Sequence, residues 1–508
     1  MLATVQSSTV YGIEGLPVEV EVDLSSGVPR FSMVGLPEGA IKEGQFRVRA
    51  ALRNAGLAFP SRRVTVNLAP ADLRKDGSAF DLPIAIGILA ASGQLPRDAL
   101  AACAVLGELS LDGRVKAVRG ALPIAAAAHA RGVRSLLLPT PNAFEAAVVQ
   151  GIDILPVDTL VDAVEWFRGA RTITPTRVDS VLLFKQVNGA EVDFADVHGQ
   201  EALKRALEVA AAGGHNVIMV GPPGAGKTML AQRLATILPA LTLEEALEVT
   251  RVHSVLGLLC GRSLVTRRPF RAPHHTISDA GLTGGGSVPR PGEVSLAHRG
   301  VLFLDELPEF RKNVLEVLRQ PLEDRRITIA RVAGTVTFPA DIMLVAAMNP
   351  CPCGYLGDAQ RPCTCSAVQI QRYRGRVSGP LLDRIDIQVQ VRAVPYHELA
   401  RARGGEASAV VRARVDRARQ IQLERFAGRR VFANAHMGPE DLRRAATVEP
   451  AALALLDRAM NSLALSARAY TRILKVARTI ADLDTSEPIH AAHIAEAIQY
   501  RSLDRVPH

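Results

Sequence analysis

The sequence predicts an α/β protein of several domains whose last segment is all-helical, and three observations lead to this fold class. The chain has 508 residues, more than a single hydrophobic core ordinarily organises. Short apolar, β-branched runs alternate with alanine-rich segments of helical spacing up to about residue 394. From residue 395 onward only the helical spacing continues. We therefore expect an α/β domain, a second α/β core and a helical domain, in that order.

The first domain is expected over residues 1–170, with glycine, proline and aspartate between its elements. Strands are predicted at Val18–Val22, Arg63–Leu68, Cys103–Leu106 and Ser135–Leu138. Helices are predicted at Glu38–Ala55, Leu82–Ala91 and Leu122–Arg131. Residues 171–192 are predicted to be a linker, because the segment begins with polar residues and is interrupted by a proline. The second α/β core is expected at 193–394 and the helical domain at 395–508.

Composition narrows the class of protein. Hydrophobic residues make up 48% and charged residues 22% of the chain, as in ordinary globular proteins. The longest apolar stretch, Leu82–Ala91, is too short to span a bilayer and contains Pro83 and Gly87. The first residues lack a basic segment followed by an apolar one, so a cytoplasmic location is expected. The net charge of +9 is compatible with a polyanionic partner but also occurs in proteins that bind no nucleic acid.

A glycine-rich run lies where an apolar strand turns into a helix. The strand is Val217–Val220, and the run after it reads Gly221-Pro222-Pro223-Gly224-Ala225-Gly226-Lys227-Thr228. The glycines let backbone N–H groups point inward at phosphate oxygens, and the helix N-terminus adds the positive end of its dipole. Lys227 would reach the β and γ phosphates and Thr228 would ligate Mg²⁺. The pattern predicts a site for ATP and Mg²⁺.

A second apolar strand ends in two carboxylates. Val301–Leu304 is followed by Asp305 and Glu306. Asp305 can help to hold Mg²⁺, and Glu306 can act as the general base for the attacking water. Such a pair is common at strand ends, but downstream of the phosphate loop it predicts an ATP hydrolase.

Later segments resemble those of AAA+ ATPases. The predicted strand Asp341–Ala347 leads to Asn349, which stands where these proteins have their polar sensor. Gly379–Asp386 resembles the arginine-finger segment of magnesium-chelatase ATPase subunits and MCM helicases, which implies that Arg384 reaches the nucleotide of a neighbouring subunit. The helix opened by Ser466 resembles the sensor-2 helix, with Arg468 as first choice for the sensor and Arg472 as second.

Three further segments extend a resemblance over the whole chain. Asp196–Gln200, Gly213–Asn216 and Arg271–Ser278 are similar to segments of the ComM/YifB family of magnesium-chelatase-like proteins. This resemblance implies an AAA+ core with a C-terminal helical lid, assembled as a hexameric ring. It also implies a helicase that drives branch migration of DNA joints in recombination, best known from natural transformation, with branched or single-stranded DNA as its partner.

A hairpin is predicted between the carboxylate pair Asp305-Glu306 and Asn349. β-Branched residues alternate over 325–338 around Gly334. In related ring helicases the corresponding hairpin touches nucleic acid, so Arg331 near its tip is the candidate DNA contact. An ordinary edge hairpin with a solvated arginine is the alternative. The glycine-rich loop 279–287 is a second candidate pore element, although it carries little charge.

Four of the six cysteines fall within fifteen residues, which suggests a metal site. Thiolates this close can hold a structural Zn²⁺ in tetrahedral geometry. The alternative is a set of free or redox-labile thiols, because C-x-C spacing is less diagnostic than C-x-x-C. The cluster comprises Cys351, Cys353, Cys363 and Cys365.

The first domain resembles the Lon-type protease domain, which has a ribosomal-S5-like fold. The similar segments are Lys75–Ala79, with Ser78 as the nucleophile candidate, and Gly107–Val115. In active members a lysine that activates the serine follows the second segment, and that position here is Leu122. We therefore expect a non-proteolytic scaffold for oligomerisation or DNA binding.

Three functions stay open at this point. The first is a DNA-translocating ring ATPase. The second is a chelatase-like remodeller of a protein client, with no DNA translocation. The third is an ATP-dependent protease, which Leu122 disfavours.

Overall fold

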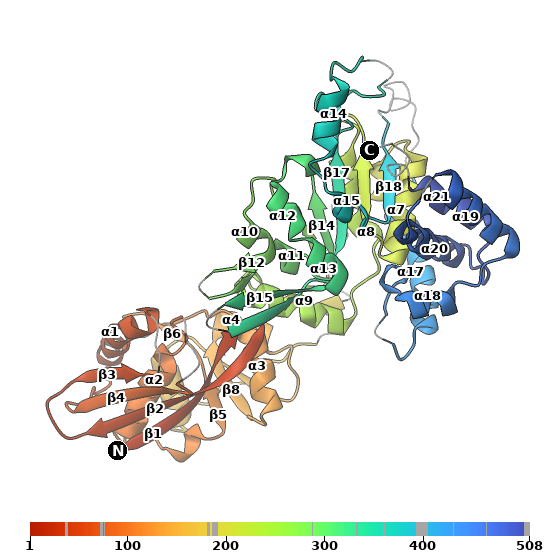
Figure 1. Ribbon diagram of the computed structural model, residues 1–508. Coiled ribbons are helices and arrows are strands. Elements are labelled where there is room, and N and C mark those ends of the chain that lie inside the picture. Colours follow the sequence, from red (N-terminus) through yellow and green to blue (C-terminus); the bar gives the residue numbers. More distant parts are fainter. Residues whose placement is uncertain are drawn as a thin grey trace. The chain divides into compact units, whose positions relative to one another are not determined.

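A computed structural model describes residues 1–35, 39–71, 75, 77–179, 183–184, 192–286, 288–331, 334–358, 361–392, 405–429, 431–463 and 465–501. The chain forms two compact units (Figure 1). The first contains Met1–Val187 together with Thr242–Thr266, and the second contains Asn188–Leu241 together with Arg267–His508.

The first unit is built on a seven-stranded sheet of order β3-β4-β2-β1-β5-β8-β9. The hairpin of β1 and β2 is antiparallel, whereas β1, β5, β8 and β9 run parallel to one another. The strands are β1 (Leu2–Tyr11), β2 (Glu14–Ser25), β3 (Phe31–Val34), β4 (Arg63–Ala69), β5 (Cys103–Val105), β8 (Ser135–Pro139) and β9 (Asp153–Val157). The helices are α1 (Gly39–Asn54), α2 (Asp81–Ala91), α3 (Ala121–Ala130), α4 (Thr140–Ala146) and α5 (Leu160–Phe167).

Helix α2 explains the most apolar stretch of the chain. All of its residues are buried, and it packs on β1 and β2. A Cβ on Gly87 would lie 2.6 Å from Cγ2 of Val22, so the glycine permits this close approach. The stretch is therefore the centre of a globular core. Among the described residues, no helix has the length and apolar character needed to cross a membrane.

The predicted strands and helices of this unit are confirmed, with ends shifted by one to a few residues. The sequence missed β1, because its centre, Gln6-Ser7-Ser8, is polar. Ser7 is nevertheless buried, and its hydroxyl donates to the Val105 carbonyl at 2.9 Å. That hydrogen bond lets a serine occupy a core position on a strand.

Helix α9 (Leu243–Val255) joins the first unit, although sequence analysis included it in the 193–394 core. It packs on α3, and the Gly120 amide donates to the Ser254 carbonyl at 3.1 Å. The Ser254 hydroxyl donates to the buried carboxylate of Glu145, which also accepts from the Leu122 amide at 3.1 Å. These contacts join residues far apart in the sequence, so no local sequence pattern predicted that α9 packs in the first unit.

The second unit contains a five-stranded parallel sheet of order β11-β14-β17-β10-β18. Its strands are β10 (Val217–Val220), β11 (Phe270–Arg271), β14 (Val301–Leu304), β17 (Met343–Met348) and β18 (Ile387–Gln390). All residues of β10, β14 and β17 are buried, as expected for strands covered on both faces. Helices α7 (Glu201–Gly213) and α8 (Lys227–Ile237) flank β10 in sequence.

The second unit also contains shorter elements. They are α10 (Asp279–Thr283), β12 (Gly284–Gly285), β13 (Arg290–Pro291), α11 (Glu293–Leu296), the 3-10 helix η3 (Leu307–Glu309), α12 (Lys312–Glu316), α13 (Arg319–Asp324), β15 (Arg326–Arg331), β16 (Gly334–Pro339), α14 (Ala367–Arg374) and α15 (Gly379–Leu382).

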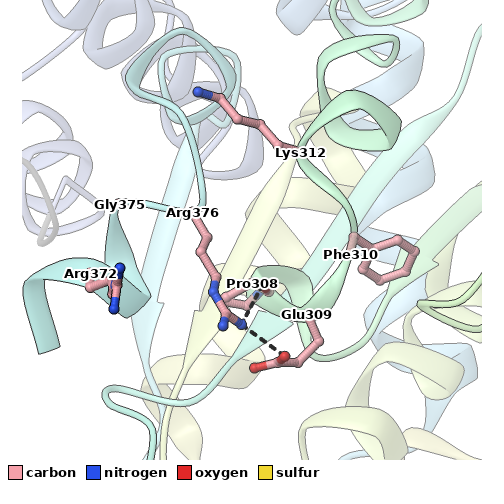
Figure 2. A pocket seen from close by; sticks show the side chains of 7 residues that line it. All are labelled: Pro308, Glu309, Phe310, Lys312, Arg372, Gly375 and Arg376. Carbon is pink, nitrogen blue, oxygen red and sulfur yellow. Dashed lines mark hydrogen bonds and ion pairs between the residues drawn. The ribbon is translucent and has the colours of Figure 1, made fainter. Parts of the chain in front are cut away.

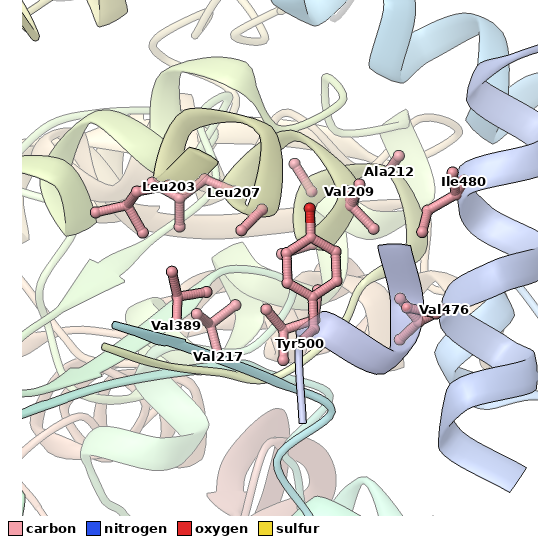
Figure 3. Packing of buried hydrophobic residues seen from close by; sticks show 14 of the residues in the cluster. Leu203, Leu207, Val209, Ala212, Val217, Val389, Val476, Ile480 and Tyr500 are labelled. Atoms are coloured by element: carbon pink, nitrogen blue, oxygen red, sulfur yellow. The ribbon is translucent and has the colours of Figure 1, made fainter. Parts of the chain in front are cut away.

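The helical domain belongs to the same unit and shares its core. Its helices are α17 (Ser408–Arg425), α18 (Pro439–Ala445), α19 (Pro450–Ser462), α20 (Ala467–Leu483) and α21 (Ala491–Gln499). Figure 3 shows Leu207 of α7, Val217 of β10 and Val476 of α20 around the ring of Tyr500. One continuous apolar cluster thus fixes these helices against the sheet, as a lid packed on an α/β core.

We expect loss of the Glu145 carboxylate to destabilise the first unit. Glu145→Ala would leave the Leu122 amide and the Ser254 hydroxyl buried without their acceptor, a defect that costs about 1–3 kcal/mol per group. Chemical unfolding of the full chain measures the change. Glu43→Ala on the exposed side of α1 is the matched control, expected within about 0.5 kcal/mol of the parent. Equal unfolding curves for the two variants would contradict this role of Glu145.

Candidate nucleotide site and metal cluster

The loop Gly221–Thr228 joins the carboxyl end of β10 to the first turn of α8. Gly224 and Gly226 adopt left-handed backbone conformations, with φ of 76° and 80°. A Cβ on Gly221 would lie 2.3 Å from the Val391 carbonyl oxygen. Glycine is therefore required at these three positions for different reasons, and the loop has the curled backbone that the motif predicts.

Lys227 reaches across this loop to the neighbouring strand. Its ammonium donates to the carbonyls of Gly221 at 2.7 Å and Pro222 at 2.9 Å, and to Oδ1 of Asn349 at 3.2 Å. Burial lowers the pKa of Lys227, while the carboxylates of Asp305 and Glu306 act in the opposite direction. The lysine and the predicted sensor Asn349 thus share one site.

Thr228 and Asp305 lie together as a Mg²⁺ site requires. The Thr228 hydroxyl donates to Oδ2 of Asp305 at 2.6 Å, and the other carboxylate oxygen accepts from the Glu306 amide at 2.9 Å. Hydroxyl and carboxylate oxygens are ligands that Mg²⁺ prefers, so this pair fits the ion.

Glu306 has a strained backbone and a histidine neighbour. Its φ is +52°, a left-handed conformation that costs a non-glycine residue energy and occurs often in functional sites. Its Oε2 lies 3.4 Å from Nδ1 of His275, whose ring lies 4.1 Å from that of His274 and 6.3 Å from that of Phe310. His275 lies within the segment Arg271–Ser278, and no role for it was predicted from the sequence. The only available signal was the adjacent pair of histidines, because the contact with Glu306 is tertiary.

The predicted arginine finger lies at the opposite edge of the sheet. Arg384 precedes β18 and Asn216 precedes β10, so both stand at the amino ends of strands whose carboxyl ends approach Gly221. A four-residue strand separates these edges by about 13 Å. Arg384 is buried and ion-paired with Glu323, and its Nη1 donates to the Pro380 carbonyl at 2.5 Å.

Both sensor-2 candidates lie at this same amino edge. Arg468 is 67% exposed and pairs with Asp383 at 3.0 Å, next to Arg384 in sequence. Arg472 pairs with Asp386, which is buried. Burial opposes ionisation of Asp386, but Arg472 and His215 hold its pKa well below its usual range. The structure therefore groups Arg384, Arg468 and Arg472, and separates all three from Lys227 of the same chain.

A small basic cavity of about 250 Å³ opens beside this arginine group. Its lining includes Arg325, Arg384, Arg472, Lys475 and the carboxylates of Glu323 and Asp386. The Asn216 side chain also lines it, accepting from the Leu344 amide at 2.8 Å and donating to the Arg384 carbonyl at 3.0 Å.

A larger open cavity of about 500 Å³ lies between η3 with the start of α12 and the end of α14 (Figure 2). Arg376 lines this cavity and donates to Oε2 of Glu309 at 2.9 Å and to the Pro308 carbonyl at 3.3 Å. Figure 2 shows Lys312 directed away from this pair. The contacts tie the turn that follows Glu306 to the segment after α14.

The predicted hairpin is present as β15 and β16. Arg331 pairs with Gly334 in the last register position, and its side chain is exposed. Residues 332 and 333, at the tip, lie outside the described part. In the glycine-rich loop 279–287, residues 279–285 form α10 and β12, and a Cβ on Gly285 would lie 3.7 Å from Nη2 of Arg331. The two candidate pore elements are therefore neighbours.

The four cysteines form one compact cluster that could hold a metal ion. Their sulfur atoms all lie within 4.8 Å of one another. Sγ of Cys351 lies 3.3 Å from that of Cys353 and 3.7 Å from that of Cys363. The Cys353 amide points at Sγ of Cys365 at 3.4 Å. Zn–S bonds of about 2.3 Å in tetrahedral geometry place sulfurs about 3.8 Å apart, so the set fits that coordination.

The position of the Lon-type lysine is apolar in the structure. Leu122 is 1% exposed, on α3. The Ser78 hydroxyl donates to the Glu108 carboxylate, and Lys75 is buried with its ammonium donating to the Gly35 carbonyl at 3.2 Å. Leu122 offers no base for Ser78, because its side chain cannot accept a proton.

The parallel sheet, the phosphate loop and the helical lid define a P-loop ATPase core of the AAA+ type. Comparison with known families agrees. Residues 193–399 match the family described as magnesium chelatase, subunit ChlI, residues 20–142 match subunit ChlI of Mg-chelatase, and residues 405–501 match the ChlI C-terminal family.

Full-length relatives narrow the assignment. The chain is 46% identical to competence protein ComM of Haemophilus influenzae and 42% identical to the protein YifB of Escherichia coli, covering 99% of this chain and 98% of each relative. A shorter similarity, 34% identity over 26% of each chain, relates it to Lon protease 2 of Bacillus subtilis. The chain belongs to the ComM/YifB family of magnesium-chelatase-like AAA+ proteins, a membership that predicts ATPase activity.

We expect Glu306→Gln to bind ATP and fail to hydrolyse it. The amide keeps the shape of the side chain but cannot accept a proton from water, and loss of a general base lowers kcat by about 10²–10⁴. Steady-state hydrolysis and equilibrium nucleotide binding measure the two effects separately. Glu316→Gln on α12 is the control and should hydrolyse ATP at the parental rate. Unchanged turnover in Glu306→Gln would remove this residue from the catalytic role.

Proposed function

We propose that this protein is an ATP-driven DNA motor that promotes branch migration and unwinding of recombination intermediates during natural transformation. The main support is the placement, within one unit, of a hydrolytic constellation and an exposed arginine hairpin with a glycine-rich neighbour. The printed name of the Haemophilus relative, a competence protein, adds weight to the biological setting. We place the protein in the cytoplasm, where a motor of this kind acts on incoming DNA.

Hydrolysis would use the residues at the carboxyl edge of the sheet. Lys227 would neutralise charge on the β and γ phosphates, and Glu306 would take a proton from the attacking water. His275 would hold the Glu306 carboxylate in position. Thr228 and Asp305 would hold Mg²⁺, which supplies charge neutralisation when bound. Asn349 would orient the γ-phosphate or the water from the end of β17.

The arginines at the amino edge support an intersubunit site. Arg384 cannot serve the phosphate loop of its own chain across about 13 Å of strand. A neighbour in a closed ring can present its loop to this edge, as a head-to-tail interface requires. We therefore propose a hexameric ring in which Arg384, with Arg468 or Arg472 beside it, completes the next subunit's site.

Mixing two inactive variants tests this arrangement. Lys227→Ala and Arg384→Ala should each lose ATPase activity, since an arginine finger contributes about 10³–10⁵ to kcat. A one-to-one mixture should recover up to about a quarter of the parental rate, because one interface in four combines an intact loop with an intact finger.

The matched control mixes Lys227→Ala with Glu306→Gln. Both substitutions lie on the same side of the interface, so no combination of subunits restores a site. If the test mixture recovers no activity, Arg384 does not act on the neighbouring subunit's site. Recovery in the control mixture would also contradict this arrangement, because activity would then return without a complete interface.

DNA contact is proposed at the tip of the β15/β16 hairpin. Arg331 is exposed, and the adjacent loop carries Gly284, Gly285 and Gly286, whose lack of side chains lets a polyanion approach the backbone. An arginine at this place can bind a phosphate of either strand without reading sequence.

We expect Arg331→Ala to weaken DNA binding and abolish stimulation of ATPase by DNA. The slope of log affinity against log salt should fall by about one unit, the effect of one lost phosphate contact. Arg326→Ala, at the other end of the same strand and also exposed, is the control. Binding and branch-migration assays with a four-way junction measure the difference. Equal behaviour of the two variants would argue against a contact at the tip.

The alternative is a chelatase-like remodeller of a protein client. The family descriptions favour this possibility, since they name a chelatase subunit. It uses the same ATPase site. It predicts that branched DNA does not change the rate of ATP hydrolysis and that the protein does not move the DNA. An ATP-dependent protease is disfavoured, because Leu122 occupies the place of the required lysine.

We further propose that the four cysteines hold a structural Zn²⁺. Their mutual distances support this choice over free thiols, as does the affinity of Zn²⁺ for tetrahedral sulfur ligands.

A further inference from the structure

The segment that carries the cysteine cluster touches the phosphate loop. Gly354 lies one residue after Cys353 and is buried, with φ of +86°. A Cβ on Gly354 would lie 2.7 Å from Cδ and 3.0 Å from Cγ of Pro223, and 3.9 Å from Cγ of Asn349. The backbone here therefore packs directly on a residue of the phosphate loop.

Other contacts bind this segment to the nucleotide site. Asn349, two residues before Cys351, accepts from the Lys227 ammonium at 3.2 Å. The Gly221 amide donates to the Met348 carbonyl at 3.2 Å. Arg374 of α14 donates to the carbonyl of Pro350, directly before Cys351, at 3.1 Å. The residues directly before the cluster are thus bonded to the phosphate loop, to its lysine and to α14.

The turn around Gly354 is held on one side by cysteines. The Gly354 amide donates to the Cys351 carbonyl at 3.0 Å, and Cys351 and Cys353 supply two of the four sulfurs. Cys363 and Cys365 supply the other two across residues 354–362. One ion bound by all four sulfurs would close this loop and remove most of its conformational freedom.

We propose that a metal ion held by the four cysteines positions the phosphate loop through Gly354 and Pro223, so that nucleotide affinity depends on the metal. This inference rests on the proposed metal site and ATP site, and it goes beyond both by linking them. The metal acts on the loop from outside and takes no part in hydrolysis.

Two glycines of the same segment provide a matched pair of variants. Gly354→Ala would force a Cβ against Pro223, whereas Gly357→Ala would add one where nothing lies within 4 Å. Both glycines have left-handed backbones, with φ of +86° and +79°, so the backbone strain of alanine is the same in each. All four cysteines stay in place in both variants. Only the contact with the phosphate loop differs.

The experiment measures the Kd of a fluorescent ATP analogue for the full-length protein. Gly354→Ala should raise Kd by about tenfold or more relative to Gly357→Ala, and Gly357→Ala should match the parent. Removing the metal with a chelator should raise Kd similarly, and reloading with Zn²⁺ alone should restore it. Co²⁺ loading should give the absorption bands of a tetrahedral thiolate site. Cys363→Ser should weaken those bands and raise Kd, while Cys260→Ser, an exposed cysteine elsewhere in the chain, should do neither.

The possible results separate cleanly. Equal Kd values for Gly354→Ala and Gly357→Ala, or for metal-loaded and metal-free protein, would overturn the link. A purified protein that neither contains nor takes up metal would overturn the metal's part in it. If thermal melting shows that removal of the metal has already unfolded the protein, the Kd values of the two metal-loaded glycine variants test the link instead. A metal-loaded parent that binds no nucleotide would instead refute the proposed ATPase function.

Discussion

The parallel pairing of β10 with β17 and β18 is the constraint on which the rest of the second unit depends. Because the three strands run the same way, their carboxyl ends bring together the phosphate loop, Asn349 and Val391. Their amino ends bring together Asn216, Asp386 and the arginines around them. A one-residue shift in register would separate Lys227 from Asn349 and would turn alternate side chains to the other face. The sheet therefore sorts the functional residues into two groups.

The amino edge is organised by a buried carboxylate. Asp386 accepts from the Asn216 amide at 3.2 Å, pairs with Arg472 of α20 and lies 3.4 Å from His215. His215 in turn lies 2.8 Å from the Thr479 hydroxyl, also of α20. A buried charge is stable only with partners of this kind, so the sheet and the lid helix are held in one arrangement. A shift of α20 would therefore move Asp386 and the segment that carries Arg384.

Much of the fold was predictable because the chain is locally consistent. The apolar strands Val217–Val220 and Val301–Leu304, the helix after the phosphate loop and the β15/β16 hairpin all appear where their patterns placed them. The contact of Thr228 with Asp305 could also be anticipated, since both follow parallel strands of one sheet. The catalytic roles of these residues stay predictions. The strand β1 was missed because its core serine Ser7 is satisfied by a distant partner, and α9 was assigned to the ATPase core because its anchor, Glu145, is about a hundred residues away.

The sequence by itself determined the chemistry that local spacing encodes: the curled glycine loop with Lys227, the acidic pair after β14 and the four clustered thiols. Tertiary structure alone decided how these parts meet. It set Arg384, Arg468 and Arg472 at the edge away from their own phosphate loop, put His275 beside Glu306 and pressed Gly354 against Pro223. The physical reason is that glycine turns, strand ends and helix starts follow from neighbouring residues, whereas contacts between them follow from the order and direction of strands in the sheet.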